Sequence, residues 1–169
     1  LSGKLDYLQR ITTQREEDCR QLFQFSKNET FVDLGAYDGD TIKEFLNYTD
    51  FSYRELVALE PDSKNFKKLQ RFVEKAGLED VLLLNKGIWS EEGALNFAAS
   101  GGRQSALQSD GKVEVPVDSV DHIMQGRPVS YMKLDVEGAE FEALSGAAET
   151  IGRWAPKLFV AAYHRDDDL

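Results

Sequence analysis

Carboxylates gather in three short stretches of the sequence, and each stretch follows an apolar run. The stretches are Asp33 to Asp40, Glu60-Pro61-Asp62 and Asp135 to Glu140. Carboxylates accept hydrogen bonds from hydroxyl groups, act as general bases, or bind divalent cations through their oxygen atoms. His164 adds an imidazole, the side chain best suited to proton transfer near neutral pH. These residues are the first candidates for chemistry.

The first stretch combines a strand, a glycine turn and a helix start. Phe31 to Leu34 is apolar apart from Asp33, Gly35 and Gly39 follow, and a helix is expected from about Thr41. This is the first unit of a nucleotide-type binding site in an open α/β sheet. The spacing from Thr41 to Glu44 predicts a capping box for the helix. The structural alternative is an ordinary turn without a ligand.

Glu60 ends the next apolar run, 25 residues after Gly35. At this position a carboxylate commonly binds the two hydroxyls of a ribose. The alternative is a solvated acid at the end of a strand. Turn and acid together predict a nucleoside ligand.

The charge of the turn distinguishes between nucleoside cofactors. The pyrophosphate of NAD needs bare backbone N–H groups at a helix N-terminus, where Asp38 and Asp40 would repel it. The G-x-G-x-x-G pattern is also absent. S-adenosylmethionine carries no phosphate and has a sulfonium cation, which an acidic pocket favours. The predicted cofactor is therefore S-adenosylmethionine.

In the third stretch, Asp135 and Glu137 are the candidates for a general base, for positioning substrate hydroxyls, or for binding a cation. Glu140 is expected to be a first-turn acid favoured by the helix dipole. His164 is either a proton-transfer group or structural, and His122 is expected at the surface. No set of metal ligands is predicted.

The elements that must position these residues follow a β-α-β-α-β order. Strands are expected at 30–35, 56–59, 81–84, 129–134 and 157–162, with the strand at 81–84 buried, and helices after residues 41, 63 and 140. Phe141 and Leu144 are expected on the inner face of the last helix. Such an order predicts an α/β fold, a doubly wound and mostly parallel sheet with helices on both faces.

Two segments depart from this order. Short strands at 94–98, 104–107 and 113–117 predict a small β excursion at about 94–117, followed by a short helix at 119–124. Residues 4–25 have helical apolar spacing, which predicts a helical cover for the sheet. The chain is expected to be a single domain, with the cover at 1–29 and the binding domain at 30–169.

Composition narrows the functional class. The chain has 169 residues, a net charge of −10 and 41% hydrophobic residues, values that suit one globular domain. The negative charge argues against nucleic-acid and anionic-membrane partners. The single cysteine, Cys19, cannot form an internal disulfide, which fits a cytoplasmic protein.

The motifs, in this order, resemble the FkbM family of S-adenosylmethionine-dependent methyltransferases. The resemblance spans about residues 30 to 169. It rests on Val32-Asp33-Leu34-Gly35-Ala36-Tyr37-Asp38-Gly39, Leu59-Glu60-Pro61-Asp62, Asn85-Lys86-Gly87-Ile88-Trp89, Ser105 in the β excursion, Val117-Asp118-Ser119-Val120-Asp121 and Met132-Lys133-Leu134-Asp135-Val136-Glu137-Gly138-Ala139-Glu140. The last segment is the most specific.

The resemblance implies a class I, Rossmann-like methyltransferase fold and methyl transfer to a hydroxyl, often on a sugar or polyketide-like acceptor. Members usually continue with further strands, so a last antiparallel pair is expected to be missing here. The expected catalytic residues are Asp135, Glu137 and His164. Cofactor binding is expected at Asp33, Gly35, Ala36, Tyr37, Asp38, Gly39, Glu60, Pro61, Asp62, Gly87, Ile88 and Asp135.

Two other functions stay open at this point. One is a nicotinamide-dependent oxidoreductase on the same fold, which the acidic turn disfavours. The other is a non-catalytic module that binds a nucleoside or a protein.

Overall fold

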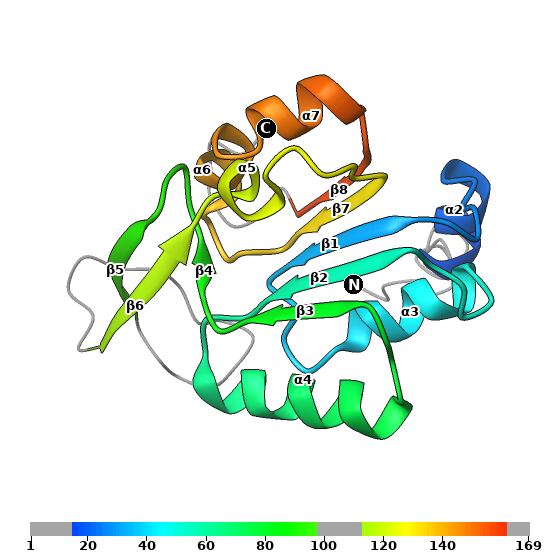
Figure 1. Ribbon diagram of the computed structural model, residues 1–169, viewed down its shortest axis with the longest axis horizontal. Helices are drawn as coiled ribbons and strands as arrows, with labels where there is room; N and C mark the ends of the chain where they lie inside the picture. Colours follow the sequence, from blue (N-terminus) through cyan, green and yellow to red (C-terminus); the bar gives the residue numbers. More distant parts are fainter. Residues whose placement is uncertain (1–14, 98–112, 162–169) are drawn as a thin grey trace, which may run out of the picture.

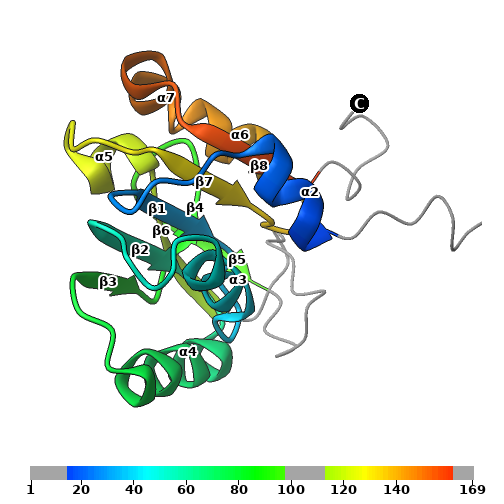
Figure 2. The same cartoon turned by 90° about the vertical axis from the view of Figure 1, so that its right-hand side faces the viewer.

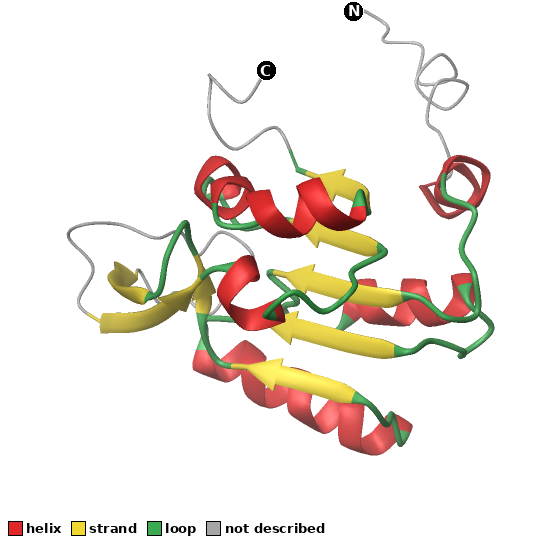
Figure 3. Cartoon of the chain, turned by 45° about the horizontal axis from the view of Figure 1, so that its top comes forward, coloured by secondary structure: helices red, strands yellow, loops and turns green. Residues whose placement is uncertain are grey.

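A computed structural model describes residues 15–97 and 113–161 of the chain. Its centre is a five-stranded sheet in the order β3-β2-β1-β7-β8, in which every neighbouring pair is parallel (Figure 1). The strands are β1 (Thr30–Leu34), β2 (Glu55–Leu59), β3 (Val81–Leu84), β7 (Tyr131–Leu134) and β8 (Lys157–Val160). Since the strands point the same way, their carboxyl ends form one edge of the sheet (Figure 3).

Helices cover both faces of this sheet, as the strand order predicts. They are α2 (Arg15–Leu22), α3 (Asp40–Tyr48), α4 (Ser63–Ala76), α5 (Val120–Met124), α6 (Glu140–Ser145) and α7 (Ala148–Trp154). Side chains alternate between the two faces along each strand. Val32 and Leu34 of β1 pack in the core with α5 and α6, and Phe31 packs with α3 and α4. The α/β doubly wound fold is confirmed.

A second sheet lies beyond the carboxyl ends of the main strands (Figures 1 and 3). It has the order β4-β6-β5, with β4 at Gly87–Ile88, β5 at Gly93–Phe97 and β6 at Val113–Asp118. This is the expected β excursion, extended by β4, which no sequence pattern indicated. The strand expected at 104–107 lies outside the described residues.

The helical cover is described from α2 onward. Phe23 and Phe25, which follow α2, contact the ring of Tyr131 on β7, with centroids 5.8 and 5.0 Å apart. In Figure 1, α2 lies beyond the amino ends of the main strands, on the side that faces the viewer in Figure 2. Residues 4–14 of the expected cover lie outside the described residues. In the described part of the chain, no helix has the length and apolar character needed to span a membrane.

Three local expectations were wrong. The capping box at Thr41 is absent, because α3 begins at Asp40 with Gly39 as its N-cap residue. The strand at 81–84 is only partly buried, because β3 is the edge strand. Phe141 is 74% exposed, whereas Leu144 packs against the core. The helix itself ends as expected, with Gly146 as its C-cap residue, and α7 follows.

Candidate functional site

The loop between β1 and α3 adopts an unusual backbone conformation. Gly35, Tyr37 and Gly39 all have positive φ angles, of 81°, 50° and 91°. The N–H groups of Gly35 and Ala36 both donate to the carbonyl of Leu59, at 3.1 and 2.9 Å. The loop is therefore fixed to the end of β2, and Tyr37 is held in a region that costs a residue with a side chain about 1 kcal/mol or more.

Close backbone and side-chain approaches explain both glycines. A Cβ atom at Gly35 would lie 2.1 Å from the carbonyl oxygen of Asp135, at the end of β7. A Cβ atom at Gly39 would lie 2.5 Å from the ring of Phe72 on α4. Positive φ angles favour glycine, and these close approaches leave no room for a Cβ atom at either position. The spacing in the sequence thus reflects two separate contacts of the loop.

Glu60 lies directly beside this loop. Its Oε2 accepts a hydrogen bond of 2.8 Å from the N–H of Tyr37, and its Oε1 accepts one of 3.0 Å from the N–H of Asp62. The residue is 6% exposed, and burial raises the pKa of its carboxyl to about 7. A carboxylate oxygen has two lone pairs, so each Oε retains one beyond these bonds. Glu60 can therefore support the loop and still accept hydroxyl groups.

Asp62 caps the next helix. Its Oδ1 accepts hydrogen bonds from the N–H groups of Lys64 and Asn65, at 2.9 and 3.0 Å, at the start of α4. Gly87 and Ile88 form β4, and the Ile88 side chain is 3% exposed in the core. These positions adjoin the strand ends as expected. In the structure, however, Asp62 caps α4 and the Ile88 side chain packs in the core. Their contacts with a cofactor stay a prediction.

A buried cation lies beneath the loop. The ammonium of Lys133 on β7 donates a hydrogen bond of 2.8 Å to the carbonyl of Gly35. It also lies 3.3 Å from Asp33 Oδ1 and 3.8 Å from Asp135 Oδ2. The side chain of Asp33 is fully buried, so it supports the loop from within the sheet. Sequence reasoning did not select Lys133, although it was the single charged residue in an apolar run.

The candidates for proton transfer differ in how they are held. The side chain of Asp135 is 37% exposed at the end of β7, and Glu137 follows it with a φ of 55°. Glu140 lies in the first turn of α6, as expected, and accepts a hydrogen bond of 3.1 Å from the N–H of Val136. His164 lies outside the described residues. Asp135 is therefore the described candidate that adjoins the glycine loop directly.

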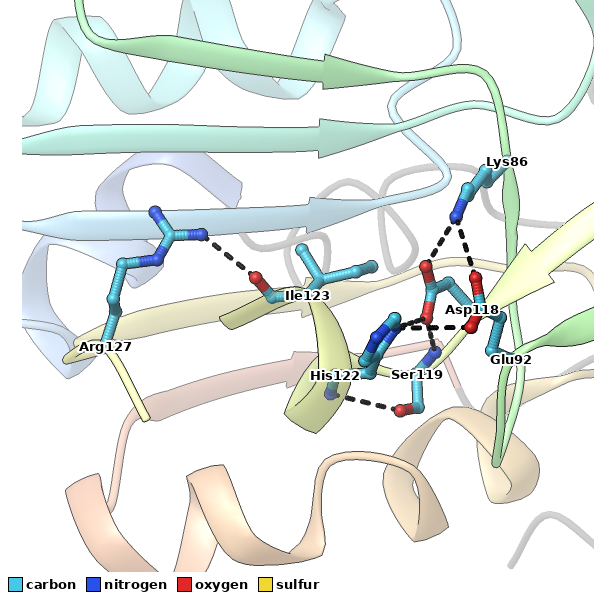
Figure 4. Close-up of polar contacts among 7 residues, drawn as sticks. All are labelled: Lys86, Glu92, Asp118, Ser119, His122, Ile123 and Arg127. Atoms are coloured by element: carbon cyan, nitrogen blue, oxygen red, sulfur yellow. Dashed lines mark hydrogen bonds and ion pairs between the residues drawn. The ribbon is translucent and has the colours of Figure 1, made fainter. Parts of the chain in front are cut away.

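A polar cluster lies near the start of the second sheet (Figure 4). Asp118 binds the ammonium of Lys86 at 2.6 Å and the Nδ1 atom of His122 at 2.7 Å. Glu92 lies 3.7 Å from Lys86 and 4.0 Å from His122. Burial alone would raise the pKa of Asp118, but bonds from Lys86, His122 and the Ser119 N–H hold it below its usual value.

Glu92, Asp118 and His122 are the kinds of residue that bind divalent cations, and their donor atoms lie within 4.8 Å of one another. The ammonium of Lys86 already binds Asp118 and lies near Glu92. It therefore balances the negative charge of these two carboxylates, which a bound metal ion would otherwise balance. His122 was expected at the surface. It is half-exposed, and it also joins α5 to the end of β6.

Several solved structures share this fold. A methyltransferase from Streptococcus mutans in complex with S-adenosylhomocysteine has a TM-score of 0.53 and 13% identity, and the match covers 90% of this chain and 74% of that one. An rRNA methylase from Streptococcus thermophilus has a TM-score of 0.55 and 12% identity, covering 92% and 76%. At these identities the likeness concerns the fold. No curated protein matches the chain significantly.

A further structure is more similar. The methyltransferase FkbM from Methylobacillus flagellatus has a TM-score of 0.74 and 26% identity over 88% of this chain. The match covers 36% of that protein, so this chain spans about a third of its length. The model of the methyltransferase FkbM domain matches residues 33–168, which include the glycine loop, Glu60 and the Asp135 region. The chain therefore belongs to the FkbM methyltransferase family.

Proposed function

We propose that this chain binds S-adenosylmethionine and transfers its methyl group to a hydroxyl on a sugar or another small metabolite. The observation that carries the proposal is the pairing of the Gly35 loop with the carboxylate of Glu60 at the carboxyl edge of the sheet. In a doubly wound sheet, ligands bind at this edge. The S-adenosylhomocysteine bound to the related fold from Streptococcus mutans supports this choice of cofactor.

The residues present fit this cofactor. The second lone pairs of Glu60 Oε1 and Oε2 can accept the two hydroxyls of its ribose. Asp38 and Asp40 add negative charge next to the loop, which suits a sulfonium and disfavours a pyrophosphate. Lys133 beneath the loop is paired with Asp33 and Gly35, so its charge is directed into the sheet.

Bound at this site, S-adenosylmethionine supplies an electrophilic methyl group. The chain must hold the oxygen of the acceptor hydroxyl in line with that methyl group, and one of its side chains must accept the proton of that hydroxyl. Asp135 is the first candidate base, because it is partly exposed and adjoins the glycine loop. Glu137 and His164 are the other two. The variants Asp135→Asn, Glu137→Gln and His164→Gln would distinguish them, with methyl transfer from labelled cofactor as the measurement.

The charge of the chain suits a small acceptor. A net charge of −10 disfavours nucleic-acid and anionic-membrane partners. With a single cysteine, the chain also fits a cytoplasmic location. We therefore expect a small metabolite with a free hydroxyl as the acceptor.

Titration calorimetry tests the cofactor. We expect S-adenosylhomocysteine to bind, and Glu60→Gln to weaken it at least about tenfold, or about 1.4 kcal/mol. Glu74→Gln, on the exposed side of α4, is the matched control and should leave binding unchanged. Tight binding of NADH alone would instead indicate an oxidoreductase. If wild type binds neither ligand and Glu60→Ala changes nothing, the chain is a non-catalytic module.

A further inference from the structure

Lys133 is a lysine buried in the middle of the main sheet. It lies on β7 in register with Asp33 of β1, and the two residues are 2% and 0% exposed. Lysines are almost never buried unless they are paired. Its ammonium contacts Asp33 on the strand before the loop, Gly35 within the loop, and Asp135 at the end of β7. One cation thus joins β1 and the loop after it to the end of β7.

The shorter contact of this ammonium is informative. Its hydrogen bond to the Gly35 carbonyl is 2.8 Å long, whereas the nearest oxygen of Asp33 lies 3.3 Å away. An ammonium has three N–H donors, so Lys133 can serve both groups. Burial raises the pKa of Asp33, and the charge and a hydrogen bond of Lys133 oppose this. The ammonium is therefore placed for the loop as well as for the carboxylate.

Holding this carbonyl also orients the next amide. The Gly35 carbonyl and the Ala36 N–H belong to one planar peptide group, so fixing the first fixes the second. The Ala36 N–H donates to Leu59 at the end of β2. The following N–H, of Tyr37, donates to Glu60 Oε2. A continuous set of contacts thus runs from Lys133 through the loop to Glu60.

We propose that Lys133 is a positioning residue for cofactor binding. Its ammonium fixes the Gly35 peptide and thereby holds the glycine loop and the Glu60 carboxylate in the arrangement that S-adenosylmethionine requires. This rests on the proposed function, because it assigns Lys133 to the same cofactor site. Lys133 acts through Gly35 and Glu60 and does not contact the cofactor itself.

A mutant cycle separates positioning from charge balance. Lys133→Met removes the ammonium and keeps most of the side-chain volume, but it leaves the buried carboxyl of Asp33 without its cation. Lys133→Met is therefore compared in two backgrounds, wild type and Asp33→Asn, by S-adenosylhomocysteine titration and thermal unfolding. We expect Asp33→Asn/Lys133→Met to unfold at a higher temperature than Lys133→Met alone, because no buried carboxylate is left unpaired. We expect it to bind S-adenosylhomocysteine at least about tenfold more weakly than Asp33→Asn.

The outcomes decide between the two roles. If the double variant binds as well as Asp33→Asn, Lys133 only balances the charge of Asp33 and the proposal is wrong. A double variant that does not fold also contradicts it, because the effect would then extend beyond the loop. If wild type does not bind S-adenosylhomocysteine, the proposed function itself fails.

A second measurement needs no ligand. Hydrogen exchange of the Ala36 and Tyr37 amides reports directly on the loop, since both donate hydrogen bonds in this arrangement. We expect these amides to exchange at least about tenfold faster in the double variant than in Asp33→Asn, with the amides of β2 unchanged. Equal exchange of the loop amides in both proteins would overturn the positioning role.

Discussion

The carboxylate of Glu60 accepts a hydrogen bond of 2.8 Å from the backbone N–H of Tyr37, which joins the end of β2 to the loop after β1. The same carboxylate is the predicted partner of the cofactor ribose. Tyr37 has a positive φ angle, so this bond also holds a residue in a conformation that it does not favour. Support of the loop and recognition of the ligand therefore depend on one buried acid.

The pKa of Glu60 predicts how the stability of the unliganded protein depends on pH. Burial raises this pKa from 4.5 to about 7, so between these values the folded state binds more protons than the unfolded state. Stability should therefore fall as the pH rises from 4.5 to about 7, with Glu60 contributing roughly 3 kcal/mol at most. Urea unfolding of wild type and Glu60→Gln between pH 4.5 and about 7 measures this contribution of Glu60 to the free energy of unfolding. Parallel pH dependences in the two proteins would contradict this assignment.

Cofactor binding should depend on pH in the opposite sense. Ribose hydroxyls donate to the ionised carboxylate, so binding favours that form and lowers the pKa of Glu60. We expect the affinity for S-adenosylhomocysteine to decrease below about pH 7, and a proton to be released on binding near that pH. Calorimetry in two buffers of different ionisation enthalpy measures the proton release. Glu60→Gln should remove it, and persistence of the release in that variant would assign it to another group.

Gly35→Ala should disrupt the loop. The added Cβ would lie 2.1 Å from the Asp135 carbonyl, at a φ of 81°. We expect a loss of about 2 to 4 kcal/mol in unfolding free energy and loss of cofactor binding. Gly152→Ala is the matched control, because its Cβ meets nothing within 4 Å and it lies within α7. It should stabilise the protein by about 0.5 to 1 kcal/mol. Equal effects of the two substitutions, in denaturant titrations, would refute the close approach.

The cluster in Figure 4 predicts a separate pH effect. The bond to Asp118 raises the pKa of His122, with a further contribution from Glu92. A raised histidine pKa gives a stabilisation that is fully present below 6.5 and is lost as the pH rises through the folded value. An NMR titration of His122 should show the raised pKa. His122→Gln should remove this part of the pH dependence, and an unshifted titration would show that the bond to Asp118 does not persist in solution.

The fold and half of the site follow from the sequence for identifiable reasons. The strands of a parallel sheet are continuous apolar runs, and the runs of β1, β2 and β7 are followed by Gly35, Glu60 and Asp135. Glu60 could be selected because its distance from the glycine turn reflects one βαβ unit. Asp62 was expected only at the cofactor, although an aspartate just before a helix is also a common helix cap.

Lys133 could not be selected in this way, because its role depends on a pairing between distant strands. Its partner, Asp33, is 100 residues earlier and becomes its neighbour only when β1 pairs with β7. Read alone, a lysine in a strand indicates a solvent-facing position. The prediction for Phe141 was wrong for a different reason, because the buried residues of α6 are Glu140 and Ala143.

The contact between Gly35 and the Asp135 backbone also bears on the order in which the protein matures during synthesis. The loop after β1 is translated early, but the carbonyl against which Gly35 packs and the ammonium that holds it come about 100 residues later. Until β7 has left the ribosome and paired with β1, the loop has neither partner. Nascent chains that end before β7 should thus be unable to capture the cofactor, and binding competence should emerge abruptly with the strand that carries Lys133.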